Sequence, residues 1–431
     1  MLRPLYLARH LQELEPGWDV EILTGSGTST DRWSPSDAAL SSLGVDLAIR
    51  RVEEPEPAGN GRVREAAERW FTVPGPWSAW WTRNVERCGD LRAADVDVIV
   101  ATMPPYQTAA GAAVIARRHR TPWIADLRDP WALDEMTIYP TGLHRRLEDR
   151  SMHAKLRSAA AIVTTTPELA NQICEAFPDL SDRPVVSIPN GFSPTDFAGS
   201  VPPTDDGIFR IVHTGSLHTD LGNRQRAITG VRRIMGGGAS AAEVLTRSHV
   251  YLVQAIEQIL AREPSLKSVV ELHLAGALSP ADEAEARRLP QVRLHGHVGH
   301  DAAVGLLMSA NLLFLPMQKM RPGVRATIVP GKLYEYLGSG RPILAAVPEG
   351  DARDILTEAG IAYVCEPDDV AGMATAIERE VTRWRAGESA RPLPAGLLAR
   401  FDRRALAERY SELLNAVVEG RVPRPTRPRR M

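Results

Sequence analysis

Short apolar runs rich in β-forming residues alternate with helical patterns along almost all of the 431 residues. In the first half of the chain these runs span residues 19–23, 96–101, 123–126, 161–165 and 185–188. Helical patterns such as residues 109–120 and 166–177 lie between them. A helix between two strands returns the chain in the same direction, so such strands pair in parallel. The pattern predicts an α/β fold.

The same alternation begins again after residue 207. The expected strands span 209–213, 270–274, 292–295, 312–315, 343–347 and 362–365, and the expected helices span 251–262, 280–289, 301–310, 332–338, 351–359 and 370–386. Between the two series, residues 191–207 are rich in Pro, Gly, Ser and Asp, which is typical of a linker. The chain is also too long for one ordinary core. We therefore expect two Rossmann-like, doubly wound parallel-sheet domains, at 1–190 and 208–400.

Both ends of the chain depart from this pattern. A doubly wound domain opens with a strand, a loop and then a helix, but here a helical pattern at residues 4–14 comes before the first strand. The first strand and its glycine loop are expected either upstream of Met1 or not at all in this domain. Residues 401–418 form a last amphipathic helix, and the Arg- and Pro-rich residues 419–431 are expected to be disordered.

The composition excludes several classes of protein. A net charge of −2 gives no general attraction to nucleic acid. No apolar run is long enough to span a bilayer, and the first residues lack the apolar core of a signal peptide. Cys88, Cys174 and Cys365 are far apart, which argues against a disulfide framework or a zinc cluster. A reducing cytoplasm is the expected compartment.

No cofactor or metal site is predicted. His295, His297 and His300 are close in sequence, but no acidic residue lies at a ligand-like spacing from them. A nicotinamide-dependent dehydrogenase is not expected either, because no Gly-x-Gly-x-x-Gly follows a strand.

One aromatic segment allows two interpretations. It contains Trp70, Phe71, Trp77, Trp80 and Trp81, interspersed with Arg69, Arg83 and Arg87. Such a mixture suits a surface that meets a membrane interface or a lipid-linked acceptor. Clustered aromatic residues belong more often to a core, which is the interpretation we favour. Peripheral contact with the inner membrane face remains the alternative.

The segment at 329–347, VPGKLYEYLGSGRPILAAV, is the most informative for function. Pro330 and Gly331 open a short helix, and Gly340 ends it in a position that favours a left-handed residue. The free amides of the first turn and the positive end of the helix dipole suit a diphosphate. Lys332 opposes the dipole unless an anion binds there, and Glu335 can accept hydrogen bonds from a ribose diol. The alternative is an ordinary Lys–Glu pair on a helix surface.

This segment resembles the donor-binding motif of glycosyltransferase family 4, in a subgroup that functions in polysaccharide biosynthesis. Four other segments resemble motifs of that subgroup in the same order: 126–131 (DLRDPW), 188–192 (IPNGF), 213–217 (HTGSL) and 292–298 (VRLHGHV). The resemblance covers nearly the whole chain. It implies the GT-B fold, with two domains facing each other across a cleft and residues 401–418 packing back on the N-terminal, acceptor-side domain.

The resemblance also implies roles for residues of the C-terminal, nucleotide-sugar-binding domain. Glu335 matches the glutamate that holds the donor ribose. Several other residues match positions that contact the donor diphosphate or bracket the base: Gly215, Ser216, Pro330, Gly331 and Lys332 at the phosphates, and His297 and Val298 at the base.

At two places the match concerns the transferred sugar and the acceptor. Many members of the family carry two glutamates eight positions apart, and this chain has Thr327 where the first would stand. Contacts to the sugar would then come from Thr327, from Arg325 or from the backbone. Arg128 and Asp129 follow a strand, at the edge where an open sheet presents ligands, and are expected to face the acceptor or the transferred sugar. The candidate catalytic residues are therefore Arg128, Asp129 and Glu335.

The function implied is that of a retaining, metal-independent glycosyltransferase. It would move a sugar from a nucleotide-diphosphate sugar to a hydroxyl of a sugar, a lipid-linked molecule or a small molecule, in glycan or polysaccharide biosynthesis. Two alternatives remain at this point. One is a nucleotide-sugar epimerase of the same fold, and the other is a catalytically impaired nucleotide-sugar-binding or scaffold protein.

Overall fold

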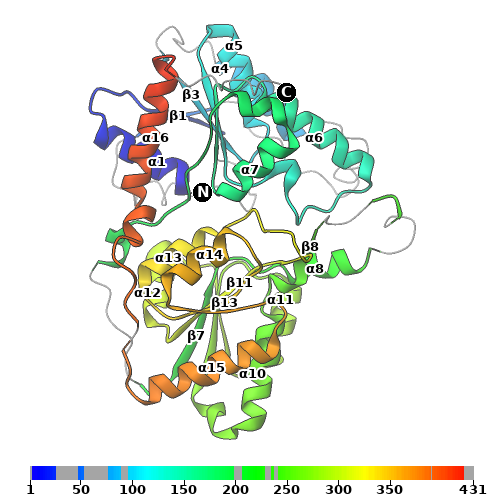
Figure 1. Cartoon of the computed structure of the whole chain (residues 1–431), viewed down its shortest axis with the longest axis vertical. Coiled ribbons are helices and arrows are strands. Elements are labelled where there is room, and N and C mark those ends of the chain that lie inside the picture. Colours follow the sequence, from blue (N-terminus) through cyan, green and yellow to red (C-terminus); the bar gives the residue numbers. More distant parts are fainter. Residues whose placement is uncertain are drawn as a thin grey trace, which may run out of the picture. The chain divides into compact units, whose positions relative to one another are not determined.

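The computed structural model describes residues 2–25, 47–52, 76–88, 96–198, 206–228, 234–236, 241–389 and 391–421 (Figure 1). The chain forms two compact units. The first consists of residues 1–134, 142–190 and 403–431, and the second consists of residues 135–141 and 191–402. No sequence pattern indicates that residues 135–141 belong with the second unit.

The first unit is built on a four-stranded parallel sheet in the order β3-β4-β5-β6. Its strands are β3 (Ile99–Met103), β4 (Trp123–Leu127), β5 (Ala161–Thr164) and β6 (Val185–Ser187). A separate parallel pair is formed by β1 (Glu21–Thr24) and β2 (Ala48–Arg51). The helices are α1 (Leu2–Leu14), α4 (Pro76–Cys88), α5 (Thr108–His119), α6 (Gly142–Leu156), α7 (Pro167–Ala176) and α16 (Arg403–Val418).

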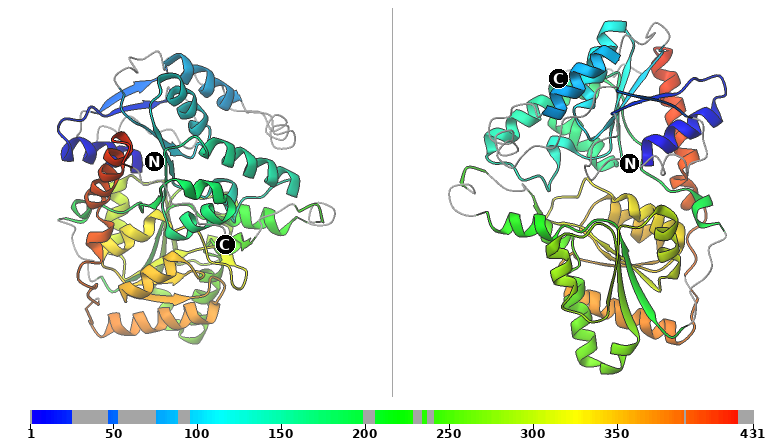
Figure 2. Two further views of the ribbon diagram at one scale, coloured as in Figure 1. Left: turned by 45° about the horizontal axis from the view of Figure 1, so that its top comes forward. Right: turned by 180° about the vertical axis from the view of Figure 1, so that it is seen from behind.

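Strand β4 is buried on both faces because its apolar side chains alternate between two cores. Trp123 and Leu127 pack with residues of α5, α6 and α7, whereas Ile124 packs on the opposite face with residues of α1 and α16. Helices α1 and α16 lie side by side on that face (Figure 2). The last helix therefore belongs to the same unit as the N-terminal residues, although some 400 residues of sequence separate them.

The second unit contains a six-stranded parallel sheet in the order β10-β9-β7-β11-β13-β14. Its strands are β7 (Phe209–Thr214), β9 (Val270–Ala275), β10 (Val292–Gly296), β11 (Leu312–Pro316), β13 (Ile343–Ala346) and β14 (Ala362–Cys365). A short antiparallel pair joins β8 (Ala242–Glu243) to β12 (Lys319–Met320). The helices are α8 (Thr219–Arg226), α10 (Val250–Arg262), α11 (Pro280–Ala286), α12 (His300–Ser309), α13 (Gly331–Ser339), α14 (Asp351–Ala359) and α15 (Val370–Arg385).

Helices cover both faces of this sheet, which confirms the doubly wound architecture. Helices α10 and α15 lie on one face of the sheet, and α13 and α14 lie on the other (Figure 1). Their apolar side chains pack in two separate cores. From β7 the chain winds outward to β9 and β10, and from β11 it winds the other way to β13 and β14. The order reverses between β7 and β11, and ligands of open α/β sheets bind at the carboxyl ends of the strands at such a switch point.

The predicted elements differ from the observed ones mainly at their ends. The strands β1, β3, β4, β5 and β6 correspond to the expected strands at residues 19–23, 96–101, 123–126, 161–165 and 185–188. Helix α6 was not predicted, because its sequence is largely charged and only Met152 and Leu156 are buried. The predicted disordered tail lies beyond the described residues from residue 422 onward.

The aromatic segment can be judged only in part. Trp70, Phe71 and the side chains of Trp77 and Arg87 lie outside the described residues. Trp80 and Trp81 are buried and pack with Val52 and Val85 in a small apolar cluster, so for these two residues the core interpretation holds. None of the helices that the structure describes combines the length and the apolar character needed to cross a membrane.

An ion pair between Arg3 and Asp126 joins α1 to the sheet of the first unit. The Arg3 guanidinium lies 3.0 Å from one Asp126 carboxylate oxygen and 3.3 Å from the other, and Thr102 Oγ1 also donates to this carboxylate. Only 1% of the Asp126 side chain is exposed. Removing one partner of a buried pair leaves the other charge uncompensated.

We predict that Asp126→Ala lowers the free energy of unfolding of the first unit by about 3 kcal/mol, for this reason. Urea denaturation followed by tryptophan fluorescence measures the change. Asp179→Ala is the control in the same unit, because the Asp179 side chain, which pairs with His153 and Arg157, is half exposed and solvent screens it. Equal stability of the two variants would contradict a structural role for the Arg3–Asp126 pair.

Candidate active site

Helix α13 begins and ends as its sequence predicts. Pro330 occupies the N-cap position and Gly331 begins the helix, with no side chain capping the first turn. Gly340 follows the last turn in the left-handed conformation, with φ of 66°. An uncapped first turn presents backbone amides and the positive end of the helix dipole. This end of α13 therefore has the local chemistry of an anion site.

The turn after β7 lies directly against Lys332. Gly215 has φ of 107°, and a Cβ atom built on it would stand 2.8 Å from Lys332 Nζ. Any side chain at this position would therefore strain the backbone, and the Lys332 ammonium group would have to move to make room for it. Gly215 and Lys332 are separated by more than 100 residues, and the fold places them together at the switch point between β7 and β11.

His213, at the end of β7, holds Lys332 in place. Its Nδ1 atom lies 2.9 Å from the Phe314 carbonyl oxygen, and its Nε2 atom lies 3.1 Å from Lys332 Nζ. Because the carbonyl can only accept, Nδ1 carries the proton and Nε2 is left as the acceptor for the ammonium group. Burial and the Lys332 charge hold the pKa of His213 well below its ordinary value, so the ring stays neutral.

A second bond fixes α13 to the same strand. The buried hydroxyl of Tyr336 accepts the backbone N–H of Thr214 at 3.1 Å and lies 3.4 Å from the Phe314 carbonyl oxygen. Burial raises the pKa of Tyr336, which keeps the phenol neutral. The start of α13 is thus held against both β7 and β11 by neutral polar groups.

Arg247 completes a cationic site that the sequence did not reveal. It lies just before α10, and its Nη1 atom donates to Gln318 Oε1 at 3.2 Å. Burial, followed by the Arg247 charge, lowers the pKa of Lys332 to about 7, while Glu335 acts in the opposite direction. Burial and then the charges of Arg247 and Lys332 lower the pKa of His218 to about 3. Arg247 lies in the first crossover of a doubly wound unit, where phosphate sites form. That position was the one signal in the sequence that could have identified Arg247 as a site residue.

The other predicted donor residues lie in varied surroundings. Glu335 is partly buried and Ser216 is exposed. His297, which is exposed, and Val298, which is partly buried, follow the carboxyl end of β10. These positions are compatible with the donor roles that the resemblance implies.

Arg325 and Thr327 precede α13 but do not share one environment. Arg325 forms an ion pair with Asp354 at 2.6 Å, and both side chains are substantially exposed. Thr327 is 3% exposed, and its hydroxyl donates to Glu135 at 2.6 Å. The structure thus shows a carboxylate beside Thr327 that comes from a distant part of the sequence.

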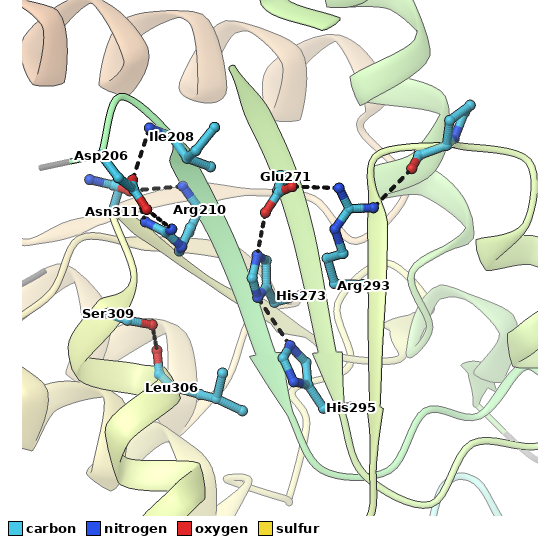
Figure 3. A network of polar contacts seen from close by, with 11 residues as sticks. Asp206, Ile208, Arg210, Glu271, His273, Arg293, His295, Leu306, Ser309 and Asn311 are labelled. Atoms are coloured by element: carbon cyan, nitrogen blue, oxygen red, sulfur yellow. Dashed lines mark hydrogen bonds and ion pairs between the residues drawn. The ribbon is translucent and has the colours of Figure 1, made fainter. Parts of the chain in front are cut away.

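The histidines near the edge strand β10 have polar partners of their own (Figure 3). His295 Nε2 lies 3.0 Å from His273 Nδ1, and His273 Nε2 lies 3.0 Å from Glu271. Arg293 pairs with the same Glu271 carboxylate, and His300 pairs with Asp196. Among the described residues no group of three or more His, Cys, Asp or Glu is arranged to hold a metal ion.

In the first unit Arg128 is engaged by the backbone. Its side chain donates to the carbonyl oxygens of Met103 and Pro104, and its own carbonyl accepts the Thr165 hydroxyl at 3.2 Å. Burial lowers the pKa of Arg128, and the charge of Asp129 opposes this effect. The guanidinium thereby holds the turn after β3 next to the end of β4, where Asp129 is partly buried.

Because the pKa of Lys332 is lowered in the native state, we expect the free energy of unfolding to depend on pH. The native state binds this proton with a pKa of about 7 and the unfolded chain with one near 10.5, so stability should rise from pH 7 to pH 10.5. Lys332→Met removes this partly buried charge. Its melting temperature should exceed that of the wild type most at pH 6–7, and the difference should shrink toward pH 10. Differential scanning fluorimetry across this range measures it, with the exposed Lys267→Met as control. A difference that does not vary with pH would contradict the burial of this charge.

Two family models match this chain. A family model described as "Glycosyl transferase 4-like domain" matches residues 3–191, and one described as "Glycosyl transferases group 1" matches residues 240–382. No curated protein matches the sequence significantly.

Solved structures show the same fold at low sequence identity. Sucrose-phosphate synthase from Thermosynechococcus elongatus is 16% identical with a TM-score of 0.62, covering 96% of this chain and 92% of that chain. Anabaena HepE in complex with UDP is 15% identical with a TM-score of 0.57, covering 93% and 100%. The α,α-trehalose 6-phosphate synthase from Burkholderia multivorans is 15% identical with a TM-score of 0.54, covering 93% and 96%. The solved structures show the GT-B fold, and the two family matches show that the chain belongs to the group 1 glycosyltransferases of family 4.

Proposed function

We propose that this enzyme transfers a sugar from a nucleotide-diphosphate sugar to a hydroxyl acceptor with retention of configuration and without a metal ion. The observation that carries the proposal is the pair of cations, Lys332 and Arg247, beside the uncapped start of α13 and the Gly215 turn. A partly buried pair of cations of this kind costs stability unless it binds an anion. A diphosphate supplies that anion.

The same groups explain how the leaving group is stabilised. As the bond between the sugar and the diphosphate breaks, negative charge grows on the phosphate oxygens. Lys332, Arg247 and the first-turn amides of α13 are already oriented by His213, Gln318 and Tyr336, so little reorganisation is needed. Two protein cations can offset this charge in place of a divalent metal, and for this reason we propose a metal-independent reaction.

The remaining assignments follow from the family resemblance. We assign Glu335 to the ribose, the backbone of His297 and Val298 to the base, and Gly215 and Ser216 to the phosphates. Thr327 and Arg325 are assigned to the region of the transferred sugar. Arg128 and Asp129 are assigned to the acceptor side, with Arg128 keeping the loop that carries Asp129 in position.

The cellular role is also part of this proposal. We place the enzyme in the cytoplasm, in glycan, polysaccharide or glycoconjugate biosynthesis, with peripheral contact at the inner membrane face if the acceptor is lipid-linked. UDP is the first nucleotide to test, because the structurally similar Anabaena HepE binds it.

A nucleotide-sugar epimerase is the second candidate. A structurally similar protein from Listeria monocytogenes is described as a putative UDP-N-acetylglucosamine 2-epimerase, with 12% identity and a TM-score of 0.55. An epimerase would convert the donor sugar without any acceptor, whereas a transferase needs one. Nuclear magnetic resonance of the donor, incubated with enzyme alone, distinguishes the two.

The donor site is tested with a panel of UDP-, GDP- and ADP-sugars in a thermal-shift assay. A ligand that binds only the native state raises the melting temperature. At a hundredfold excess over Kd it adds about 2.7 kcal/mol to the free energy of unfolding. We predict that Lys332→Ala and Glu335→Ala each remove most of the shift, whereas Lys267→Ala keeps it. Full shifts in both site variants would exclude this site. A protein that binds the donor but transfers sugar to no acceptor in any extract would indicate the catalytically impaired, scaffold-like alternative.

The same site predicts how binding depends on pH. A bound diphosphate favours the protonated form of Lys332, so UDP binding should take up a proton above pH 7. The Kd for UDP should therefore rise by up to about tenfold per pH unit between pH 7 and pH 9. Isothermal titration calorimetry in buffers of different ionisation enthalpy measures both the Kd and the proton uptake. Lys332→Arg, which stays charged, should bind UDP with little dependence on pH in this range; the wild-type dependence in that variant would assign the proton to another group.

A further inference from the structure

Glu135 is a buried carboxylate in residues 135–141, a short segment of the second unit that lies in sequence between two parts of the first. Among the described residues up to residue 190, only residues 135–141 belong to that unit. The Glu135 residue is 4% exposed. A buried carboxylate is costly unless several donors satisfy it, so its surroundings identify what it does.

The carboxylate joins both ends of the connection between β11 and α13. One oxygen accepts the side-chain amide of Gln318 at 2.9 Å and the backbone N–H of Thr327 at 3.3 Å. The other accepts the Thr327 hydroxyl at 2.6 Å. Gln318 follows β11, and Thr327 stands four residues before α13 begins. Glu135 thus fixes the two points between which this long connection runs.

The bond to Gln318 extends to the cationic site. Because Gln318 Nε2 donates to Glu135, its amide is oriented with Oε1 facing away from the carboxylate. That oxygen accepts Arg247 Nη1 at 3.2 Å. The orientation of the amide is therefore determined by the carboxylate at one end and the guanidinium at the other, and each bond polarises and strengthens the next.

The next residue contacts Arg247 directly. Met136 Sδ lies 3.4 Å from Arg247 Nη1, the same atom that donates to Gln318. Two consecutive residues therefore position Arg247 Nη1. Glu135 acts through the Gln318 amide, and Met136 contacts the nitrogen directly.

We propose that Glu135 is a positioning residue of the diphosphate site, acting through Gln318 on Arg247. This inference rests on the proposed function, since it assumes that Arg247 and Lys332 bind the donor diphosphate. The physical reason is the repulsion between two cations that must stay close in a poorly solvated place. Glu135 offsets that repulsion through the Gln318 amide, and so it keeps Arg247 beside Lys332 in the state that receives the diphosphate.

The test measures UDP binding to the full-length protein by isothermal titration calorimetry. Glu135→Gln keeps the shape of the side chain and removes its charge, and we expect it to weaken UDP binding about tenfold, the effect of losing one charge-assisted hydrogen bond. Gln318→Leu cuts the connection to Arg247 but leaves Glu135 bonded to Thr327, and should give a similar loss. Glu358→Gln, at an exposed pair in the same unit, is the matched control and should bind as the wild type does.

A double-mutant cycle separates positioning from a general effect on the fold. Arg247→Ala removes the group on which Glu135 acts, so adding Glu135→Gln to it should change the Kd less than about twofold. A similar tenfold loss in the presence and absence of Arg247 would overturn the proposal, and so would wild-type binding by both Glu135→Gln and Gln318→Leu. If Glu135→Gln does not fold, Gln318→Leu decides alone, with the same cycle.

The outcomes also distinguish this inference from the proposed function. If UDP binding survives Lys332→Ala and Arg247→Ala, the diphosphate site itself is wrong. If those variants lose UDP binding while the Glu135 and Gln318 variants retain it, the site stands and only the positioning role of Glu135 fails.

Discussion

The second unit depends on one unfavourable interaction, the partly buried position of the Lys332 side chain against the turn that follows β7. The turn approaches this closely only because residue 215 is a glycine with a left-handed backbone. Neutral partners hold the charge without cancelling it, since His213 accepts from Lys332 and is itself fixed by a backbone carbonyl. A cation kept in this way is destabilising in the empty protein and favourable once an anion arrives.

The packing of the second unit serves this arrangement. Helix α13 presents Leu333 and Leu337 to the core, and Tyr336 from the same helix bonds to the end of β7. The helix therefore cannot shift along the sheet without breaking both apolar and polar contacts. The site is consequently preorganised by the core, and the groups that would meet the donor need little adjustment.

Charged residues at the end of β4 join this strand to neighbouring segments of the first unit. Asp126 pairs with Arg3 from α1, and Arg128 donates to the carbonyl oxygens of the turn after β3. Trp131 has a left-handed backbone with φ of 57°, stacks on Tyr106 and donates to Glu148 at 2.6 Å. Strain of this kind persists where surrounding contacts impose it. Contacts on both sides of Asp129 therefore hold the DLRDPW segment in place.

The sequence by itself determined the doubly wound fold, the family and the local form of α13, because periodicity, Pro330 and Gly340 act over a few residues. Only the tertiary structure decided which distant groups meet at the start of that helix. Arg247 and Glu135 carry no local signal, since a single Arg or Glu in a loop is usually solvated. They reach the site because a parallel sheet brings the carboxyl ends of its strands to one edge, and because residues 135–141 join the second unit.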